Sequence, residues 1–246
     1  MLIGVIAGEA VVGLDEPALR VLLEAGDVQK LNTANLGVAL ARREHGATTV
    51  SATMELAAAA GIRVFATGGI GGVHRGYGTQ LDISTDLVAL TRFPVAVVTS
   101  GVKSILNVAA TRELLETLGV PVVGFATDDF PAFYLRRTEP ALRVDARFDE
   151  AAKLAQYLKR ELARTSRGVV VANPIPSADE LPRDHWEEWL TQAEAAAHAQ
   201  GISGRAWTPF VLGRVHEFSR GATLRANIAL AKANALLAAQ LARAMG

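Results

Sequence analysis

Short apolar runs alternate with segments of helical periodicity through the middle of the chain. The runs that have the length of a buried strand are IRVFAT (62–67), PVAVVTS (94–100), PVVGFA (121–126) and GVVVAN (168–173). Helical patterns separate them near 84–91, 103–118 and 149–165. Strands that are apolar throughout are typical of a sheet with helices on both faces. The pattern predicts an α/β fold, namely a single three-layer α/β/α domain with a mixed, largely buried sheet.

The two ends of the chain differ from this middle part. At the front, LIGVIAGEAVVGL predicts a β-hairpin that turns at Ala7–Glu9, and a helix follows between Asp15 and Gly26. A second helix is predicted from Thr33 to His45. The C-terminal part is predicted to be helical, with segments near 178–200, 208–218 and 223–244. Because no repeat or linker-like stretch divides the chain, residues 1–246 are predicted to form one domain.

Composition narrows the classes of partner. The chain has 25 basic and 25 acidic residues, so no overall field favours nucleic acid or a membrane surface, and a small substrate fits better. It has no cysteine, so any metal would be held by oxygen or imidazole ligands. The N-terminus has no basic region typical of a signal peptide, and the apolar stretch 223–245 carries charged and amide side chains. We therefore expect a cytoplasmic protein without a membrane span.

The glycine-rich segment ATGGIGGVHRGYG (66–78) directly follows a predicted strand. Such a loop lets backbone N–H groups approach an anion, and phosphate is a common ligand there. The segment lacks the Gly-Lys-Ser/Thr ending of a Walker loop and the spacing of a dinucleotide fingerprint. It is either a tight structural turn or a ligand loop. His74 and Arg75 favour the ligand loop, because imidazole and guanidinium groups are poor core residues and good contacts for phosphate or sugar.

Asp82, Ser84 and Asp86 are spaced two residues apart where a helix is predicted to begin. One interpretation is helix capping with favourable charge at the N-terminus of the helix dipole. The other is a site for a hard metal ion, since manganese and magnesium take one or two carboxylates and keep several waters.

Lys103 follows the predicted strand PVAVVTS after a short turn at Gly101. A lysine at such a place is ordinarily an exposed charge. If it is desolvated, its pKa falls, and a neutral amine can attack carbon to form an imine. Ligands of open α/β sheets also gather at the ends of strands. Farther along, Asn227 and Asn234 lie on one face of the last helix and either bond to neighbouring helices or face the ligand.

In order along the chain, these segments resemble the pseudouridine-5′-phosphate glycosidases, also called the indigoidine synthase A-like family. The resemblance rests on HGATTVSATMELAAAAGIRVFATGGIGGVHRG, LDISTDL, GVKSIL, FPAFY, NPIP, WTPFVLGRVHEFSRG and LRANIALAKANA, and it extends from about residue 3 to about residue 240. It implies the reversible cleavage of pseudouridine 5′-phosphate to uracil and ribose 5-phosphate through a lysine Schiff base. It also implies a manganese ion, with magnesium as the alternative, and a homotrimer.

The resemblance also implies roles for individual residues. Lys103 matches the covalent nucleophile, and Asp82 matches the metal ligand. The remaining implied positions contact substrate: Lys30, Val50, Thr67, His74, Ser84, Thr85 and Asp86. Asn227 is a further candidate for substrate contact because of its place on the face of the last helix. Thr67 and His74 are placed in this group by the matching glycine loop.

The sequence departs from the family pattern at its front, where the strand that carries the family's general acid, a glutamate, has no counterpart. Val102, Asn107 and the surroundings of Lys30 also differ from the family pattern. Two alternatives therefore stand beside the glycosidase: a weakly active or inactive protein that binds sugar phosphates, and another Schiff-base enzyme that acts on a phosphosugar, such as an aldolase.

Overall fold

In the computed structural model, which describes residues 1–75, 81–202 and 207–246, the strands form two sheets. The larger sheet has the order β5-β6-β9-β7-β8, and each neighbouring pair is parallel. Its strands are β5 (Val64–Ala66), β6 (Ala96–Thr99), β7 (Val122–Phe125), β8 (Ala146–Phe148) and β9 (Val169–Ala172). The predicted apolar runs form all of these except β8, an edge strand of three residues that the sequence pattern did not indicate.

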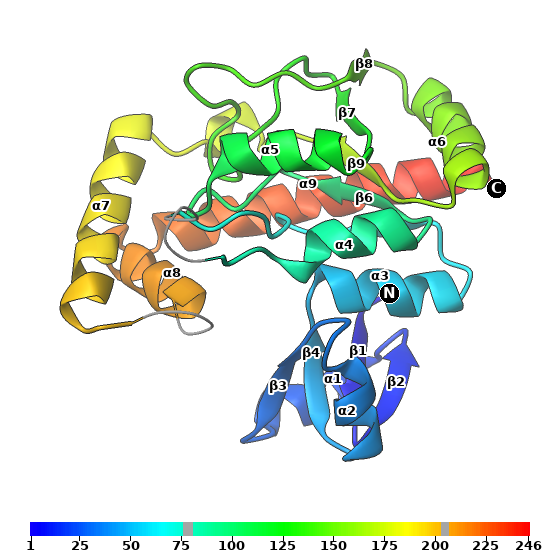
Figure 1. Ribbon diagram of the computed structural model, residues 1–246, viewed down its shortest axis with the longest axis horizontal. Helices are drawn as coiled ribbons and strands as arrows, with labels where there is room; N and C mark the ends of the chain where they lie inside the picture. The colour runs from blue at the N-terminus through cyan, green and yellow to red at the C-terminus, as the bar shows by residue number, and fades with distance from the viewer. Residues whose placement is uncertain (76–80, 203–206) are drawn as a thin grey trace.

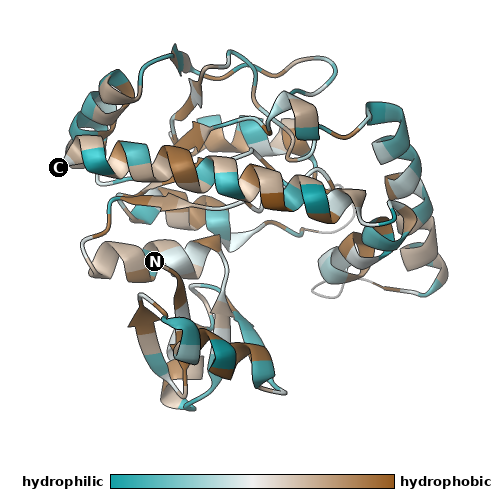
Figure 2. Cartoon of the chain, turned by 180° about the vertical axis from the view of Figure 1, so that it is seen from behind, coloured by the Kyte–Doolittle hydropathy of each residue, from teal (hydrophilic) through white to brown (hydrophobic). Residues whose placement is uncertain are grey.

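Helices cover both faces of this parallel sheet (Figure 1). Successive side chains of a strand point to opposite faces of the sheet, and in the central strands both faces are apolar. Val97 and Val170 belong to one buried cluster, and Val98 and Val171 belong to another on the opposite face. The first cluster includes residues of α3 (Val50–Ala59), α4 (Thr85–Arg92) and α5 (Val108–Thr117). The second includes residues of α6 (Ala151–Thr165) and α9 (Ala222–Met245), and α9 runs across the sheet in the view from behind (Figure 2). The predicted three-layer α/β/α fold is confirmed.

The smaller sheet comes from the N-terminal part of the chain and supplies the mixed pairing. Its strands are β1 (Ile3–Ile6), β2 (Glu9–Val12), β3 (Val28–Leu31) and β4 (His45–Thr48), in the order β2-β1-β4-β3. Strand β1 is antiparallel to β2 and β4, whereas β3 and β4 are parallel. The predicted hairpin is present, and α1 (Glu16–Glu24) begins as expected, with the Asp15 carboxylate accepting a hydrogen bond from Ala18 N at 2.9 Å. The sequence pattern predicted one sheet that is both buried and mixed. The structure instead has a buried sheet that is wholly parallel and a separate, smaller sheet that is mixed.

The predicted helix from Thr33 to His45 is wrong at both ends. Helix α2 (Leu36–Ala41) is shorter, and the chain leaves it through Arg43, which has a φ of 57°. His45 opens β4 instead of closing a helix. Gly46, the residue after the predicted helix, lies in the middle of the small sheet, where a Cβ atom would lie 2.0 Å from Leu31 Cδ1. A long-range packing requirement therefore explains this glycine.

After β9 the chain is helical. The elements are η1 (Ser177–Asp179), α7 (Arg183–Ala199), α8 (Trp207–Phe218) and α9. Helices α7 and α8 pack together at one end of the molecule, and α9 returns along the parallel sheet (Figure 1). Within the described residues, no helix combines the length and the apolar character needed to cross a membrane.

Candidate active site

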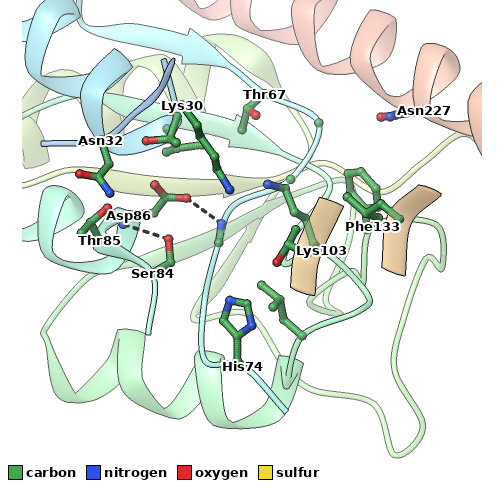
Figure 3. A pocket seen from close by; sticks show the side chains of 18 of the residues that line it. Lys30, Asn32, Thr67, His74, Ser84, Thr85, Asp86, Lys103, Phe133 and Asn227 are labelled. Carbon is green, nitrogen blue, oxygen red and sulfur yellow. Dashed lines mark hydrogen bonds between the residues drawn. The ribbon is translucent and has the colours of Figure 1, made fainter. Parts of the chain in front are cut away.

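A cavity of about 1060 Å³ lies where the carboxyl ends of β5 and β6 meet the small sheet and the α8–α9 helices. Parallel strands end at the same edge of their sheet, so this edge collects the loops that follow them. The ten residues that were given catalytic, metal-binding or substrate-binding roles all line the cavity: Lys30, Val50, Thr67, His74, Asp82, Ser84, Thr85, Asp86, Lys103 and Asn227. Arg75, the other candidate of the glycine loop, does not line it, and its Nε lies 3.7 Å from Glu194 Oε1. Three separate parts of the chain thus bring the candidates together (Figure 3).

Lys103 lies in the turn that follows β6 and is largely withdrawn from solvent. Gly101 makes the turn possible, because it has a φ of +87° and a Cβ atom there would lie 1.8 Å from the Pro131 carbonyl oxygen. Burial lowers the pKa of the Lys103 ammonium; nearby Asp86 opposes this effect, and the positive charge of Lys30 adds to it. The side-chain amines of Lys30 and Lys103 point toward one another across the cavity (Figure 3). This environment favours a neutral amine at Lys103.

Asp86 is the most deeply buried carboxylate of the cavity, with a relative exposure of 4%. Its Oδ1 accepts a hydrogen bond from Ser51 N at 2.9 Å, and its Oδ2 accepts one from Gly71 N at 2.8 Å. Ser84 is the N-cap of α4, and its hydroxyl accepts a hydrogen bond from Asp86 N at 3.2 Å. The capping interpretation of this segment is therefore correct for Ser84, while Asp86 binds backbone groups of two other segments.

The N-termini of α3 and α4 meet at the wall of the cavity. Thr49 and Val50 come from the start of α3, and Thr85 comes from the start of α4. The Ser51 hydroxyl bridges the two helices, because it lies 3.0 Å from Thr85 Oγ1 and 3.0 Å from Thr49 Oγ1. The positive ends of two helix dipoles thus face the same space as Lys30, an arrangement that suits a phosphate group.

His74 and Asp82 form a pair at the glycine loop, with 3.5 Å between His74 Nδ1 and Asp82 Oδ2. Burial lowers the pKa of His74, against the raising effect of Asp82, and Lys30 and Lys103 lower it further. Among the described residues, no group of three or more acidic or histidine side chains is arranged to hold a metal ion. Asp82 has a partly exposed carboxylate that lines the cavity, which fits a hard cation that keeps most of its waters. Metal binding at Asp82 remains a prediction.

Asn234 does not line the cavity but joins the strand ends behind it. Its Nδ2 donates to the Thr67 carbonyl oxygen at 2.8 Å and to Ser100 Oγ at 3.1 Å, and its Oδ1 accepts from Asn173 Nδ2 at 2.9 Å. These partners follow β5, β6 and β9. Asn227, two turns earlier on α9, faces the cavity instead (Figure 3). Asn234 thus has a structural role, although its partners are strand ends and not the neighbouring helices that were expected, while Asn227 lies where a ligand could contact it.

Sequence reasoning missed part of the cavity wall. The residues not anticipated as ligand contacts include Asn32, Thr48 and Thr49 near the small sheet, and Thr208, His216 and Thr223 on the C-terminal helices. Phe133 and Tyr134, which belong to the FPAFY segment, also line the cavity, although neither was named as a candidate. The glycines of the loop are the sequence signal for Phe133, because its ring packs against them. Cβ atoms at Gly68 and Gly69 would lie 3.3 and 2.6 Å from atoms of the Phe133 ring.

The fold and the cavity define an α/β protein with a buried amine at the carboxyl edge of a parallel sheet. The family model described as "Indigoidine synthase A like protein" matches residues 1–244. The chain belongs to this indigoidine synthase A-like family, as its motifs indicated.

Relatives and solved structures extend this comparison. A protein of Nocardioides sp. named pseudouridine-5′-phosphate glycosidase is 50% identical over 243 residues, which cover 98% of this chain and 78% of that protein. A protein of the same name from Geobacillus kaustophilus is 50% identical over 233 residues, covering 94% and 77%. The crystal structure of the prealnumycin C-glycosynthase AlnA in complex with ribulose 5-phosphate has a TM-score of 0.92 at 34% identity, covering 99% of this chain and 80% of that one. An indigoidine synthase A-like protein from Thermotoga maritima has a TM-score of 0.88 at 36% identity, covering 98% and 78%.

Proposed function

We propose that this protein is a pseudouridine-5′-phosphate glycosidase that reversibly converts pseudouridine 5′-phosphate and water into uracil and ribose 5-phosphate. The observation that carries the proposal is the buried Lys103 amine, which faces a cavity with two helix N-termini on its wall. The names of relatives about half identical over nearly the whole chain support the same reaction. AlnA, named a C-glycosynthase, supports carbon–carbon glycosidic chemistry with a pentose phosphate in this fold.

The substrate explains why an amine is required. In pseudouridine, C1′ of the ribose is bonded to carbon C5 of uracil, so protonation of a leaving heteroatom, the usual glycosidase device, has no target. In the proposed mechanism the C1′–O4′ bond breaks, O4′ takes up a proton, and Lys103 Nζ bonds to C1′. The nitrogen lone pair then forms a C1′=N imine while the C1′–C5 bond breaks and C5 gains a proton. Water hydrolyses the imine, which releases ribose 5-phosphate and regenerates the amine.

The surrounding residues position the substrate. We assign the phosphate to the starts of α3 and α4, with Val50, Ser84, Thr85 and Lys30 around it, because helix N-termini and a lysine favour an anion there. The remaining candidates, Thr67, His74, Asp86 and Asn227, line the rest of the cavity along the glycine loop, the first turn of α4 and α9, where they would contact sugar or base. Binding energy from the phosphate would hold C1′ beside the amine.

A divalent metal ion would be held by Asp82, with water as its other ligands. Bound there, manganese or magnesium supplies a fixed positive charge that polarises water and oxygen atoms near the sugar and base. His74, paired with Asp82, would keep the carboxylate oriented.

Borohydride trapping tests the proposal. Reduction of the protein in the presence of ribose 5-phosphate should add the mass of the reduced sugar phosphate to a peptide that contains Lys103. Lys103→Ala should abolish both the adduct and the release of uracil. Lys159→Ala, which removes an exposed lysine on α6, is the matched control and should keep both.

The same assay separates the alternatives. A sugar-phosphate-binding protein would show a higher melting temperature with ribose 5-phosphate but no adduct and no uracil. Another Schiff-base enzyme would form the adduct, yet uracil would fail to compete for it. Either result would overturn the proposed reaction.

A further inference from the structure

Within the described part of the chain, Asn234 makes every hydrogen bond between α9 and the ends of the parallel strands. Its Nδ2 donates to the Thr67 carbonyl oxygen and to Ser100 Oγ, and its Oδ1 accepts from Asn173 Nδ2. The side chain is fully buried. The other α9 side chains packed on this face of the sheet are apolar, namely Leu237, Ala238 and Leu241. Because apolar contacts have no preferred direction, the amide of Asn234 fixes where α9 lies along the sheet.

Ser100 connects this amide to the turn that carries Lys103. Its N–H donates to the Gly68 carbonyl oxygen at 3.0 Å, and its own carbonyl oxygen accepts from Phe133 N at 2.8 Å. Both partners belong to segments that line the cavity, and the Lys103 turn follows Ser100 directly. Ser100 is fully buried and is held through its backbone and its hydroxyl. The amide of Asn234 therefore holds the start of the Lys103 turn.

The same helix brings Asn227 to the cavity. Asn227 precedes Asn234 by two turns in α9, which runs from Ala222 to Met245. At 1.5 Å per residue the two side chains start about 10 Å apart along the helix axis, so they act on different groups. Asn227 faces the cavity into which Lys103 also points (Figure 3). Because a helix keeps its residues in fixed register through its backbone hydrogen bonds, a shift of α9 at Asn234 also displaces Asn227.

We propose that Asn234 is a positioning residue of the proposed reaction, which keeps Asn227 on α9 and the Lys103 amine at a fixed separation across the cavity. This inference rests on the proposed function. One amide serves both groups, because it belongs to α9 and binds the Lys103 turn through Ser100. Asn234 does not line the cavity, so its effect on a bound phosphosugar is exerted through Asn227 and Lys103.

Two substitutions break the link from its two ends. Ser100→Ala removes one acceptor of the amide and leaves the contact with the Thr67 carbonyl oxygen in place. Asn234→Leu removes all three hydrogen bonds. The matched control is Thr127→Val, which removes another buried hydroxyl. That hydroxyl bonds to the Asp129 backbone in the loop after β7, and Thr127 does not line the cavity, so the control should keep wild-type activity.

We expect Asn234→Leu to slow uracil release and borohydride trapping at saturating substrate roughly 10- to 100-fold, the usual consequence of displacing a reacting group by about 1 Å. Ser100→Ala should slow both by a smaller factor, because α9 keeps two of its three contacts. Neither effect requires a change in the identity of any group that faces the cavity.

A double-mutant cycle with Asn227→Ala separates positioning from a general loss of stability. The effects of residues that lie about 10 Å apart and act independently multiply in kcat/KM. If Asn234 places Asn227, then Asn227→Ala should lower kcat/KM clearly in the wild-type protein but by less than about twofold in Asn234→Leu, where Asn227 is already displaced. Circular dichroism identifies a variant that does not fold, and if Asn234→Leu is that variant, the cycle is carried out with Ser100→Ala.

Several results would overturn the inference. One is a trapping rate within about twofold of wild type in folded Asn234→Leu. Others are losses that multiply across the cycle, or an Asn227→Ala protein with wild-type kcat/KM. Equal losses of activity in Asn234→Leu and Thr127→Val would show that lower stability alone explains the effect. Failure of the proposed function is distinguishable, because the wild-type protein would then form no adduct at Lys103.

Discussion

Replacing Asn234 by leucine tests the polar contact that joins α9 to the strand ends. Leucine has the same number and branching of side-chain heavy atoms, but it can neither donate to Thr67 and Ser100 nor accept from Asn173. Ser100 Oγ keeps a partner, because it donates to the Asn173 carbonyl oxygen at 3.0 Å. The substitution therefore takes partners from two groups, the Thr67 carbonyl and the Asn173 side-chain amide.

A buried polar group without a partner costs roughly 1–3 kcal/mol, so two such groups predict a loss of about 2–6 kcal/mol in the free energy of unfolding. Urea denaturation followed by circular dichroism measures this loss directly. Asn227→Leu is the matched control, because Asn227 is on the same helix, lines the cavity and is exposed. The control should change stability by less than about 0.5 kcal/mol. A loss below about 1 kcal/mol in Asn234→Leu, or equal losses in both variants, would refute this account of the contact.

Three further predictions concern single positions. Gly101→Ala should cost more than about 2 kcal/mol of stability, because its φ of +87° and the neighbouring carbonyl oxygen exclude a side chain. Gly37→Ala, at an exposed position of α2, should instead gain about 0.5–1 kcal/mol, and urea titration would contradict us if both variants changed stability in the same direction. Lys103→Met should melt at a higher temperature than wild type at neutral pH, because it removes a buried charge. The difference should shrink as the pH rises toward the ordinary pKa of lysine, since a lowered pKa in the folded state makes wild-type stability increase with pH. Calorimetry across this pH range checks the trend. Burial raises the pKa of Tyr134 to about 12, so the wild-type protein should lose stability between pH 10 and about 12, and Tyr134→Phe should lose less over the same range in a denaturant titration.

The parallel sheet could be predicted because its strands are apolar at every position. The central strands are fully buried, as are Val97, Val98, Val170 and Val171. Apolar runs of strand length with helical patterns between them were therefore enough to indicate a sheet with helices on both faces. The small sheet could be predicted only as far as its hairpin of β1 and β2. Strand β4 contains Gly46 and only four residues, and its conformation depends on partners in β1 and β3 that are distant in the sequence.

The candidate site was predictable where backbone constraints leave a mark in the sequence. The glycine loop, the cap at Ser84 and the turn at Gly101 each require particular residue types, and these segments carry His74 and Lys103. Thr208 and His216 carry no such mark. They reach the cavity only through the packing of α8 against its neighbours, which local sequence does not specify.

The contact between Asn234 and Thr67 also has a consequence for biosynthesis. The two residues are 167 positions apart, so nearly the whole chain must be made before the strand ends and α9 can meet. A chain that ends before α9 therefore leaves the ends of β5, β6 and β9 without the side chain that joins them.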